Sequence, residues 1–294
     1  MVQISIVFMQ MGFCCTYIIF VATNLCSVLS YYGISSSISK LILLQAIVYI
    51  PLSWIRHINY FAFSNLIADV CILYGLAYIV LQSGILLVEQ GVQEDVHLFN
   101  PVDYPIFIGT AVFTFEGIGL VIPTQSALAP SAKPDFEHLL TYTIIGLLLF
   151  YTGFSTINYM AYGSTIAPIV TSSLVVNGWS VSVQLGYSIA QLLSYPLFLF
   201  PVVNIVEETL LFPRQNLVSS FELMKRTKTK NGVRSCIVLL TILIAYYGQD
   251  RLDLFVSLVG AVCCVPLSFI YPPLFCLKVI LNIKNLKKHA ILMD

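Results

Sequence analysis

Long uninterrupted apolar stretches recur along this chain and constrain its fold more than any other feature. A helix that crosses the hydrocarbon core of a bilayer needs about 20 mainly apolar residues. Because the stretches are continuous and do not alternate at every second residue, they favour membrane helices over the strands of a closed barrel. We therefore predict a single all-α membrane domain over 1–294 with eight spans, at about 3–29, 38–54, 59–82, 104–127, 139–161, 181–205, 233–247 and 254–281.

The composition excludes three broad classes of protein. Residues of the AVILMFWYC set make up 58% of the chain and charged residues only 10%, whereas soluble domains average about 45–50% and about 25%. The same hydrophobicity rules out an intrinsically disordered chain. A formal net charge of zero leaves no basic face for nucleic acid. This composition fits a protein embedded in a lipid bilayer.

Neither a metal centre nor an enzyme active site is predicted. All eight cysteines fall in apolar stretches and none forms a paired CxxC motif. We expect them to act as small apolar side chains rather than as metal ligands or disulfide partners. The chain has no HExxH, GxSxG or GxxxxGK(S/T) motif. It therefore gives no support to a hydrolase or to ATP-driven transport, and we expect no cofactor.

Basic residues divide unevenly between the two sides of the membrane when the spans are threaded from a cytosolic residue 1. Two of the 14 basic residues, Lys40 and Arg251, then lie opposite the cytosol. Because Lys and Arg concentrate in cytosolic connections, this division predicts that both termini are cytosolic. The basic residues on the predicted cytosolic side are Arg56, Lys133, Arg214, Lys225, Arg226, Lys228, Lys230, Arg234, Lys278, Lys284, Lys287 and Lys288.

The longest basic segment, 222–234, has the sequence ELMKRTKTKNGVR. Basic clusters close to a membrane span bind anionic lipid headgroups in many proteins, so a lipid-binding or regulatory patch is one interpretation. A solvated cytosolic loop that only sets the topology is the other, and simpler, interpretation.

Two acidic residues, Asp69 and Glu116, lie inside predicted spans. A carboxylate at the centre of a bilayer costs about 2.5–3.5 kcal/mol even on the more permissive insertion scale, so each is a functional candidate. Asp69 has Ser64 and Asn65 about one turn away in an otherwise regular helical sequence. A structural polar contact between helices is the simpler explanation for Asp69.

Glu116 is set apart by three helix-breaking neighbours, Gly117, Gly119 and Pro123. In a helix interior glycine costs about 1 kcal/mol and proline about 3 kcal/mol, so this group should open the span near its centre. An opened helix presents C=O groups on one half and N–H groups on the other, which can hold the ammonium and carboxylate of an amino acid. Desolvated beside this break, Glu116 is a candidate proton carrier. The alternative is a kink packed against a neighbour, with protonated Glu116 hydrogen-bonded to it.

Four segments make the chain recognisable. FTFEGIGLVIPTQSAL (113–128) resembles the sixth-span motif of the amino acid/auxin permease family. The similar branch contains fungal vacuolar amino acid transporters and animal proton-coupled amino acid transporters. GFCCTYIIFVATNL (12–25), SYPLFLFPVVNIVEE (194–208) and FIYPPLFCLK (269–278) are similar to the third, eighth and tenth spans of that branch. The resemblance covers nearly the whole chain.

The resemblance implies a fold and a function. The fold would be part of an inverted repeat of five plus five helices, with the family's first two spans and its last span absent from the chain. The function would be secondary, proton-coupled transport of small or neutral amino acids across a vacuolar or other acidic internal membrane. A short chain that no longer transports and has a binding or regulatory role is the alternative. The implied partners are an amino acid, a proton and the lipid bilayer, with no nucleic acid.

By the same resemblance, the substrate would bind along the opened segment 113–119, with Glu116 as the proton-coupling residue. Tyr17 would close over the substrate, and Ser194 and Tyr195 would line its pathway; core packing is an equal interpretation for these three. The implied substrate-binding residues are Tyr17, Phe113, Thr114, Phe115, Glu116, Gly117, Ile118, Gly119, Ser194 and Tyr195.

Overall fold

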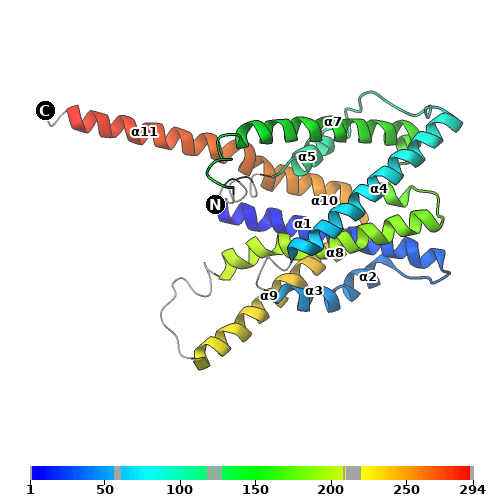
Figure 1. Ribbon diagram of the computed structural model, residues 1–294, viewed down its shortest axis with the longest axis horizontal. Coiled ribbons are helices and arrows are strands. Elements are labelled where there is room, and N and C mark those ends of the chain that lie inside the picture. Colours follow the sequence, from blue (N-terminus) through cyan, green and yellow to red (C-terminus); the bar gives the residue numbers. More distant parts are fainter. Residues whose placement is uncertain are drawn as a thin grey trace.

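Helices and the turns between them make up the structure of the chain (Figure 1). The computed structural model describes residues 2–55, 61–117, 121, 125, 128–207, 209 and 220–291, and no strand occurs within these residues. The helices are α1 (Val2–Tyr31), α2 (Ile38–Leu44), α3 (Ala46–Ser53), α4 (Phe61–Gln90), α5 (Tyr104–Thr114), α7 (Phe136–Tyr162), α8 (Gly178–Val206), α9 (Ser220–Gly248), α10 (Leu252–Val259) and α11 (Tyr271–Ile291). The predicted all-α architecture is confirmed.

Five helical stretches of the described residues have the length and composition of membrane spans. Two further apolar stretches, Ile38–Ser53 and Tyr104–Thr114, are shorter than these five. The polytopic membrane architecture is confirmed, whereas the count of eight spans and the five-plus-five repeat stay predictions. The five stretches long and apolar enough to cross a bilayer are Val2–Tyr31, Asn65–Gln90, Phe136–Thr165, Gly178–Val206 and Thr227–Leu281.

The apolar runs divide differently from the predicted spans in two places. Predicted spans 233–247 and 254–281 fall within one helical stretch, which turns through a short 3₁₀ segment at Gln249–Arg251. Predicted span 38–54 is divided at Gln45, between α2 and α3. The side-chain amide of Gln45 donates a hydrogen bond to the Ile18 carbonyl at 3.0 Å, so the residue at the division is tied to α1.

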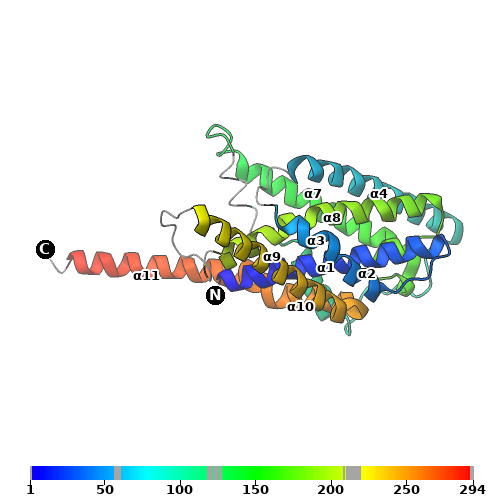
Figure 2. The ribbon, with the colours of Figure 1, turned by 90° about the horizontal axis from the view of Figure 1, so that it is seen from below.

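The main core forms around α1, which packs against α2, α8, α9 and α10. Figures 1 and 2 show α1 running alongside α8 through the bundle. Apolar residues occur on all sides of α1 rather than along one stripe, which suits a buried helix. Cys14 and Cys15 are fully buried in this core as small side chains. Tyr195 of α8 stacks on Tyr49 of α3, with ring centroids 4.0 Å apart, and bonds to the Thr241 hydroxyl of α9 at 2.8 Å.

α4 crosses α8 at a close contact that requires glycine. A Cβ on Gly75 would overlap the ring of Tyr187, whose hydroxyl donates to the Ile72 carbonyl at 3.2 Å. α7 packs on α4 at the edge of the bundle and leaves most of its apolar surface exposed. The core thus extends from α1 through α8 to α4, with α7 outermost.

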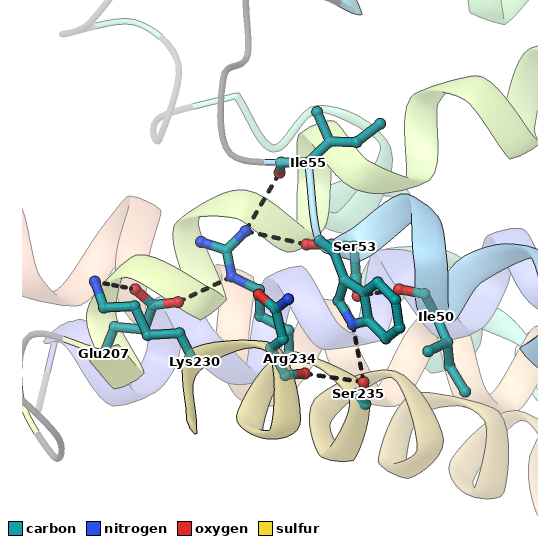
Figure 3. Close-up of polar contacts among 9 residues, drawn as sticks. Ile50, Ser53, Ile55, Glu207, Lys230, Arg234 and Ser235 are labelled. Atoms are coloured by element: carbon teal, nitrogen blue, oxygen red, sulfur yellow. Dashed lines mark hydrogen bonds and ion pairs between the residues drawn. The ribbon is translucent and has the colours of Figure 1, made fainter. Parts of the chain in front are cut away.

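A buried ion-pair cluster joins the C-terminal ends of α3 and α8 to the middle of α9 (Figure 3). The carboxylate of Glu207, directly after α8, accepts hydrogen bonds from Lys230 at 2.8 Å and from Nε of Arg234 at 2.9 Å. Nη1 of Arg234 also donates to the carbonyls of Ser53 at 3.0 Å and Ile55 at 3.3 Å. Only 4% of Arg234 and 6% of Glu207 are exposed. We call Glu207, Lys230 and Arg234 the Glu207 cluster.

The Glu207 cluster corrects the simpler interpretation of segment 222–234. The segment lies in α9, which begins at Ser220, and is not a loop. Lys230 and Arg234 form ion pairs with Glu207, so they hold α9 to the end of α8 and are not simply solvated charges that set the topology. Arg234 also suits its position, because a cation at the C-terminal end of α3 complements unpaired carbonyls and the negative end of the helix dipole.

Candidate functional site

α5 ends at Thr114, in the middle of the predicted span 104–127. The N–H of Phe115 caps the last turn, and Glu116 and Gly117 follow outside any helix. The helix therefore presents its carbonyl end at this point, where the last C=O groups lack helical partners. Two expected site residues, Ile118 and Gly119, lie outside the described residues.

The carboxyl group of Glu116 contacts a residue far away in the sequence. Ser268 donates its hydroxyl hydrogen to Oε2 of Glu116 across 2.6 Å, and both side chains are partly buried. Ser268 lies in the π-helical segment η7 (Pro266–Ile270), which follows a first π-helical segment, η6 (Gly260–Cys264). π-helical turns are rare and occur frequently at functional sites.

A cavity of about 820 Å³ lies beside Glu116, bounded by the end of α5, one face of α7 and η7. Four of the expected site residues, which are consecutive in the sequence, line it: Thr114, Phe115, Glu116 and Gly117. α7 supplies a mainly apolar wall that includes Tyr151, whose ring packs edge to face on Phe115 with centroids 5.6 Å apart. None of the described residues that line this cavity is basic.

An aromatic chain connects Phe113 to Tyr17, two further expected site residues. The ring of Phe113 lies 4.3 Å from that of Phe13 on α1. Phe198 on α8 lies 5.3 Å from Phe13 and 5.2 Å from Tyr17, measured between ring centroids. Phe13 and Phe198 were not expected as site residues. Helical spacing gave a signal for both, because Phe13 lies four positions before Tyr17 and Phe198 four positions after Ser194.

Neither Phe113 and Tyr17 nor the remaining candidates are among the residues that line the cavity. Tyr195 is fully buried in the main core against Tyr49 and Thr241, an arrangement that matches the core-packing interpretation. Ser194, its neighbour on α8, is partly buried and is not among the residues that line the cavity. Asp69, the second intramembrane acid, is exposed on α4 and also lies outside the cavity lining.

The groups gathered at the end of α5 suit a bound cation. The C-terminal end of a helix carries a partial negative charge, and the Glu116 carboxylate lies directly beyond it. In the described part of the chain, no group of three or more His, Cys, Asp or Glu side chains could hold a metal ion. An ammonium group is the ligand chemistry that a carboxylate and helix carbonyls fit.

Two carboxylates outside the long apolar stretches have shifted pKa values. Burial by itself raises the pKa of Glu207, but hydrogen bonds and charges from Lys230 and Arg234 outweigh burial and hold that pKa below its usual value. Hydrogen bonds from the hydroxyl and the backbone N–H of Ser164 hold the pKa of Asp95 below its usual value. Asp95 thereby links the connection after α4 to the turn that follows α7.

Comparison with known proteins assigns the chain to a family. The family profile described as "Transmembrane amino acid transporter protein" matches residues 1–293. The chain belongs to this family. The family membership inferred from the four sequence segments is confirmed.

Named relatives of the chain within this transporter family come from fungi and plants. Vacuolar amino acid transporter 3 of Schizosaccharomyces pombe is 39% identical over 282 residues, which cover 95% of this chain and 42% of that protein. Vacuolar amino acid transporter 4 of Saccharomyces cerevisiae is 35% identical, with coverage of 93% and 41%. An amino acid transporter of Arabidopsis thaliana is 29% identical, with coverage of 96% and 62%. The chain thus spans about two fifths of the fungal relatives' length. No solved structure gives a significant match.

Proposed function

We propose that the chain acts as a secondary, proton-coupled transporter of small or neutral amino acids in a vacuolar membrane, with both termini in the cytosol. Family membership and the names of the fungal relatives support amino acids as cargo and the vacuole as location. The observation that carries the proposal is the end of α5, which meets the Glu116 carboxyl group at the edge of the 820 Å³ cavity.

The substrate's ammonium group is the part that this end of α5 would bind. The final carbonyls of α5 and the carboxylate of Glu116 both attract a cation, and they lie within three residues of one another along the chain. In broken-helix transporters the C-terminal ends of half-helices coordinate cations and the N-terminal ends point at anionic substrate groups. In our proposal the substrate binds along segment 113–119, of which Ile118 and Gly119 lie outside the described residues.

The cavity is suited to a neutral side chain. Small-molecule sites occupy about 300–1,000 Å³ and combine mostly apolar walls with a few placed polar groups, and this cavity of about 820 Å³ lies in that range. Its wall on α7 is mainly apolar, whereas Thr114, Glu116 and Ser268 provide polar groups near α5. An acidic substrate side chain would have no basic partner among the described lining residues.

Glu116 is our proposed proton carrier. A carboxylate within a span costs about 2.5–3.5 kcal/mol, a cost that protonation or a bound ammonium group removes. Alternate binding of a proton and a substrate at one carboxyl group would couple the two movements. Alternating access would then carry the site from one face of the membrane to the other.

The proposal is tested with the purified full chain in proteoliposomes. A pH gradient is imposed in either direction, and accumulation of radiolabelled neutral amino acids is measured. Glu116→Gln should abolish gradient-driven accumulation. Asp69→Asn is the matched control, because it removes the other intramembrane carboxylate, which lies outside the cavity, and it should leave accumulation unchanged.

Two results would overturn the proposal. Unchanged gradient dependence in Glu116→Gln would remove Glu116 from the coupling step. Failure of the well-folded wild-type chain to accumulate any neutral amino acid would favour the alternative, a membrane protein with a binding or regulatory role.

A further inference from the structure

We infer that Ser268 is a positioning residue that holds the Glu116 carboxyl group at the cavity, an inference that rests on the proposed coupling role of Glu116. The two residues are 152 positions apart and approach to 2.6 Å. Both line the 820 Å³ cavity. The contact is therefore made by tertiary structure at the site itself.

A hydroxyl is a suitable partner for a carboxyl group that changes protonation state. An ionised carboxylate only accepts hydrogen bonds, whereas a protonated one also donates. The Ser268 hydroxyl can donate in the first case and accept in the second, so the pair can stay in contact through both states. A lysine or arginine at this position would instead favour the ionised form alone. The observed 2.6 Å separation is in the range for a hydroxyl bonded to a carboxylate.

The position of Ser268 is set by a close helix crossing. A Cβ on Gly109 of α5 would overlap the hydroxyl and the backbone of Ser257 on α10. A Cβ on Gly260, the first residue of η6, would overlap the Gly109 carbonyl. Glycine at both positions lets the two backbones touch. The crossing therefore fixes α5 against the segment that carries Ser268.

Ser268 and Glu116 meet beyond this crossing. Glu116 is seven residues beyond Gly109 and lies past the end of α5 at Thr114. Ser268 is eight residues beyond Gly260 and is carried there by the π-helical segments η6 and η7. A π-helix uses i to i+5 hydrogen bonds and so takes more residues per turn than an α-helix. The close approach at the two glycines is thus followed on both segments by the Ser268–Glu116 contact.

Few other ionisable groups face Glu116 from the described elements. Cys264 of η6 interacts with it electrostatically, and Tyr151 of α7 lines the same cavity. No described basic residue lines the cavity. Ser268 donates a hydrogen bond to the Glu116 carboxyl group and is thereby placed to control its orientation.

The test compares gradient-driven accumulation with exchange of internal and external amino acid at equal pH. Ser268→Ala should lower gradient-driven accumulation by about tenfold, because a hydrogen bond to a charged group is lost, and should leave exchange largely intact. Ser268→Thr keeps the hydroxyl and should restore most of the loss. Ser188→Ala is the control, because this buried hydroxyl bonds within its own helix to the Gln184 carbonyl at 2.7 Å.

A second pair of variants tests the crossing. Gly109→Ala should separate α5 from α10 and reduce accumulation as Ser268→Ala does. Gly153→Ala on α7 has open space around the added methyl group and should not. This pair also checks the inference if Ser268→Ala folds poorly.

The outcomes separate this inference from the proposed function. Loss of accumulation in Glu116→Gln but not in Ser268→Ala would overturn the role of Ser268 alone. Normal accumulation in Glu116→Gln would overturn the proposed function, and the role of Ser268 with it. Equal loss of exchange and accumulation in Ser268→Ala, with no rescue by Ser268→Thr, would show a general structural defect and would also overturn the inference.

Discussion

Replacement of Arg234 by alanine should destabilise the folded bundle strongly. Arg234 is 4% exposed and donates hydrogen bonds to the Glu207 carboxylate and to the carbonyls of Ser53 and Ile55. Arg234→Ala would leave Glu207 with Lys230 alone and leave both carbonyls without this donor. Removing one partner of a buried ion pair costs about 3–5 kcal/mol. At roughly 2–4 °C per kcal/mol, the melting temperature should fall by about 6–20 °C.

The assay is thermal unfolding of the detergent-purified chain, followed by the loss of its monodisperse peak in size-exclusion chromatography. Lys228→Ala is the matched control, because it removes an exposed basic residue from the same helix. Arg234→Lys keeps the charge but not the forked geometry, and should recover only part of the stability. Equal melting temperatures for Arg234→Ala and Lys228→Ala would refute the reasoning, since the cluster would then contribute no more than a surface charge.

Three further predictions concern other contacts. Because the pKa of Glu207 is lowered in the folded chain, the cluster stabilises the fold fully above the usual glutamate pKa of about 4.3 and loses its effect as the pH falls through the lowered value. The difference in melting temperature between wild type and Arg234→Ala should therefore shrink in acid. A difference that stays constant with pH would contradict this. Gly75→Ala should cost about 1–3 kcal/mol through overlap with Tyr187, whereas Gly84→Ala, with open space around it, should be neutral or slightly stabilising in the same melting assay. Asp95→Asn should weaken the link to Ser164 and speed hydrogen exchange of the Ser164 amide; unchanged exchange would show that the link does not hold the turn.

The sequence predicted the elements of the fold well because continuous apolar runs have few alternatives in a membrane. It predicted less well how those runs divide. Span 38–54 reads as one run of apolar residues, yet the chain divides at Gln45, whose amide is held by the Ile18 carbonyl. That bond depends on where α1 lies, which local sequence does not encode. The count of spans stays open for the same reason.

Within the candidate site, local signals and tertiary contacts contributed differently. Gly117 beside Glu116 marks the place where α5 ends, two positions before that acid. Ser268, by contrast, lies in an apolar run with no pattern that links it to Glu116. Tyr195 belongs to a segment that resembles the family motif, but its ring is in the main core. A motif identifies a helix, and only packing decides which of its faces reaches the cavity.

The charged residues show the same limit. The orientation prediction counted Lys230 and Arg234 among the basic residues on the cytosolic side. The structure shows in addition that both form ion pairs with Glu207. The pairing connects the end of α8 to α9 across residues 208–219 of the sequence. Spacing gives no sign of such a contact, because helical rules relate only residues three or four positions apart.

The most direct test of the central claim measures amino acid flux and proton flux together in the same proteoliposomes. With no pH gradient imposed, addition of a neutral amino acid to the wild-type chain should evoke a proton movement coupled to that of the substrate, and Glu116→Gln should abolish that proton movement. An amino acid flux without proton movement in the wild type, or an unchanged proton movement in Glu116→Gln, would contradict the account of a proton-coupled site at the end of α5.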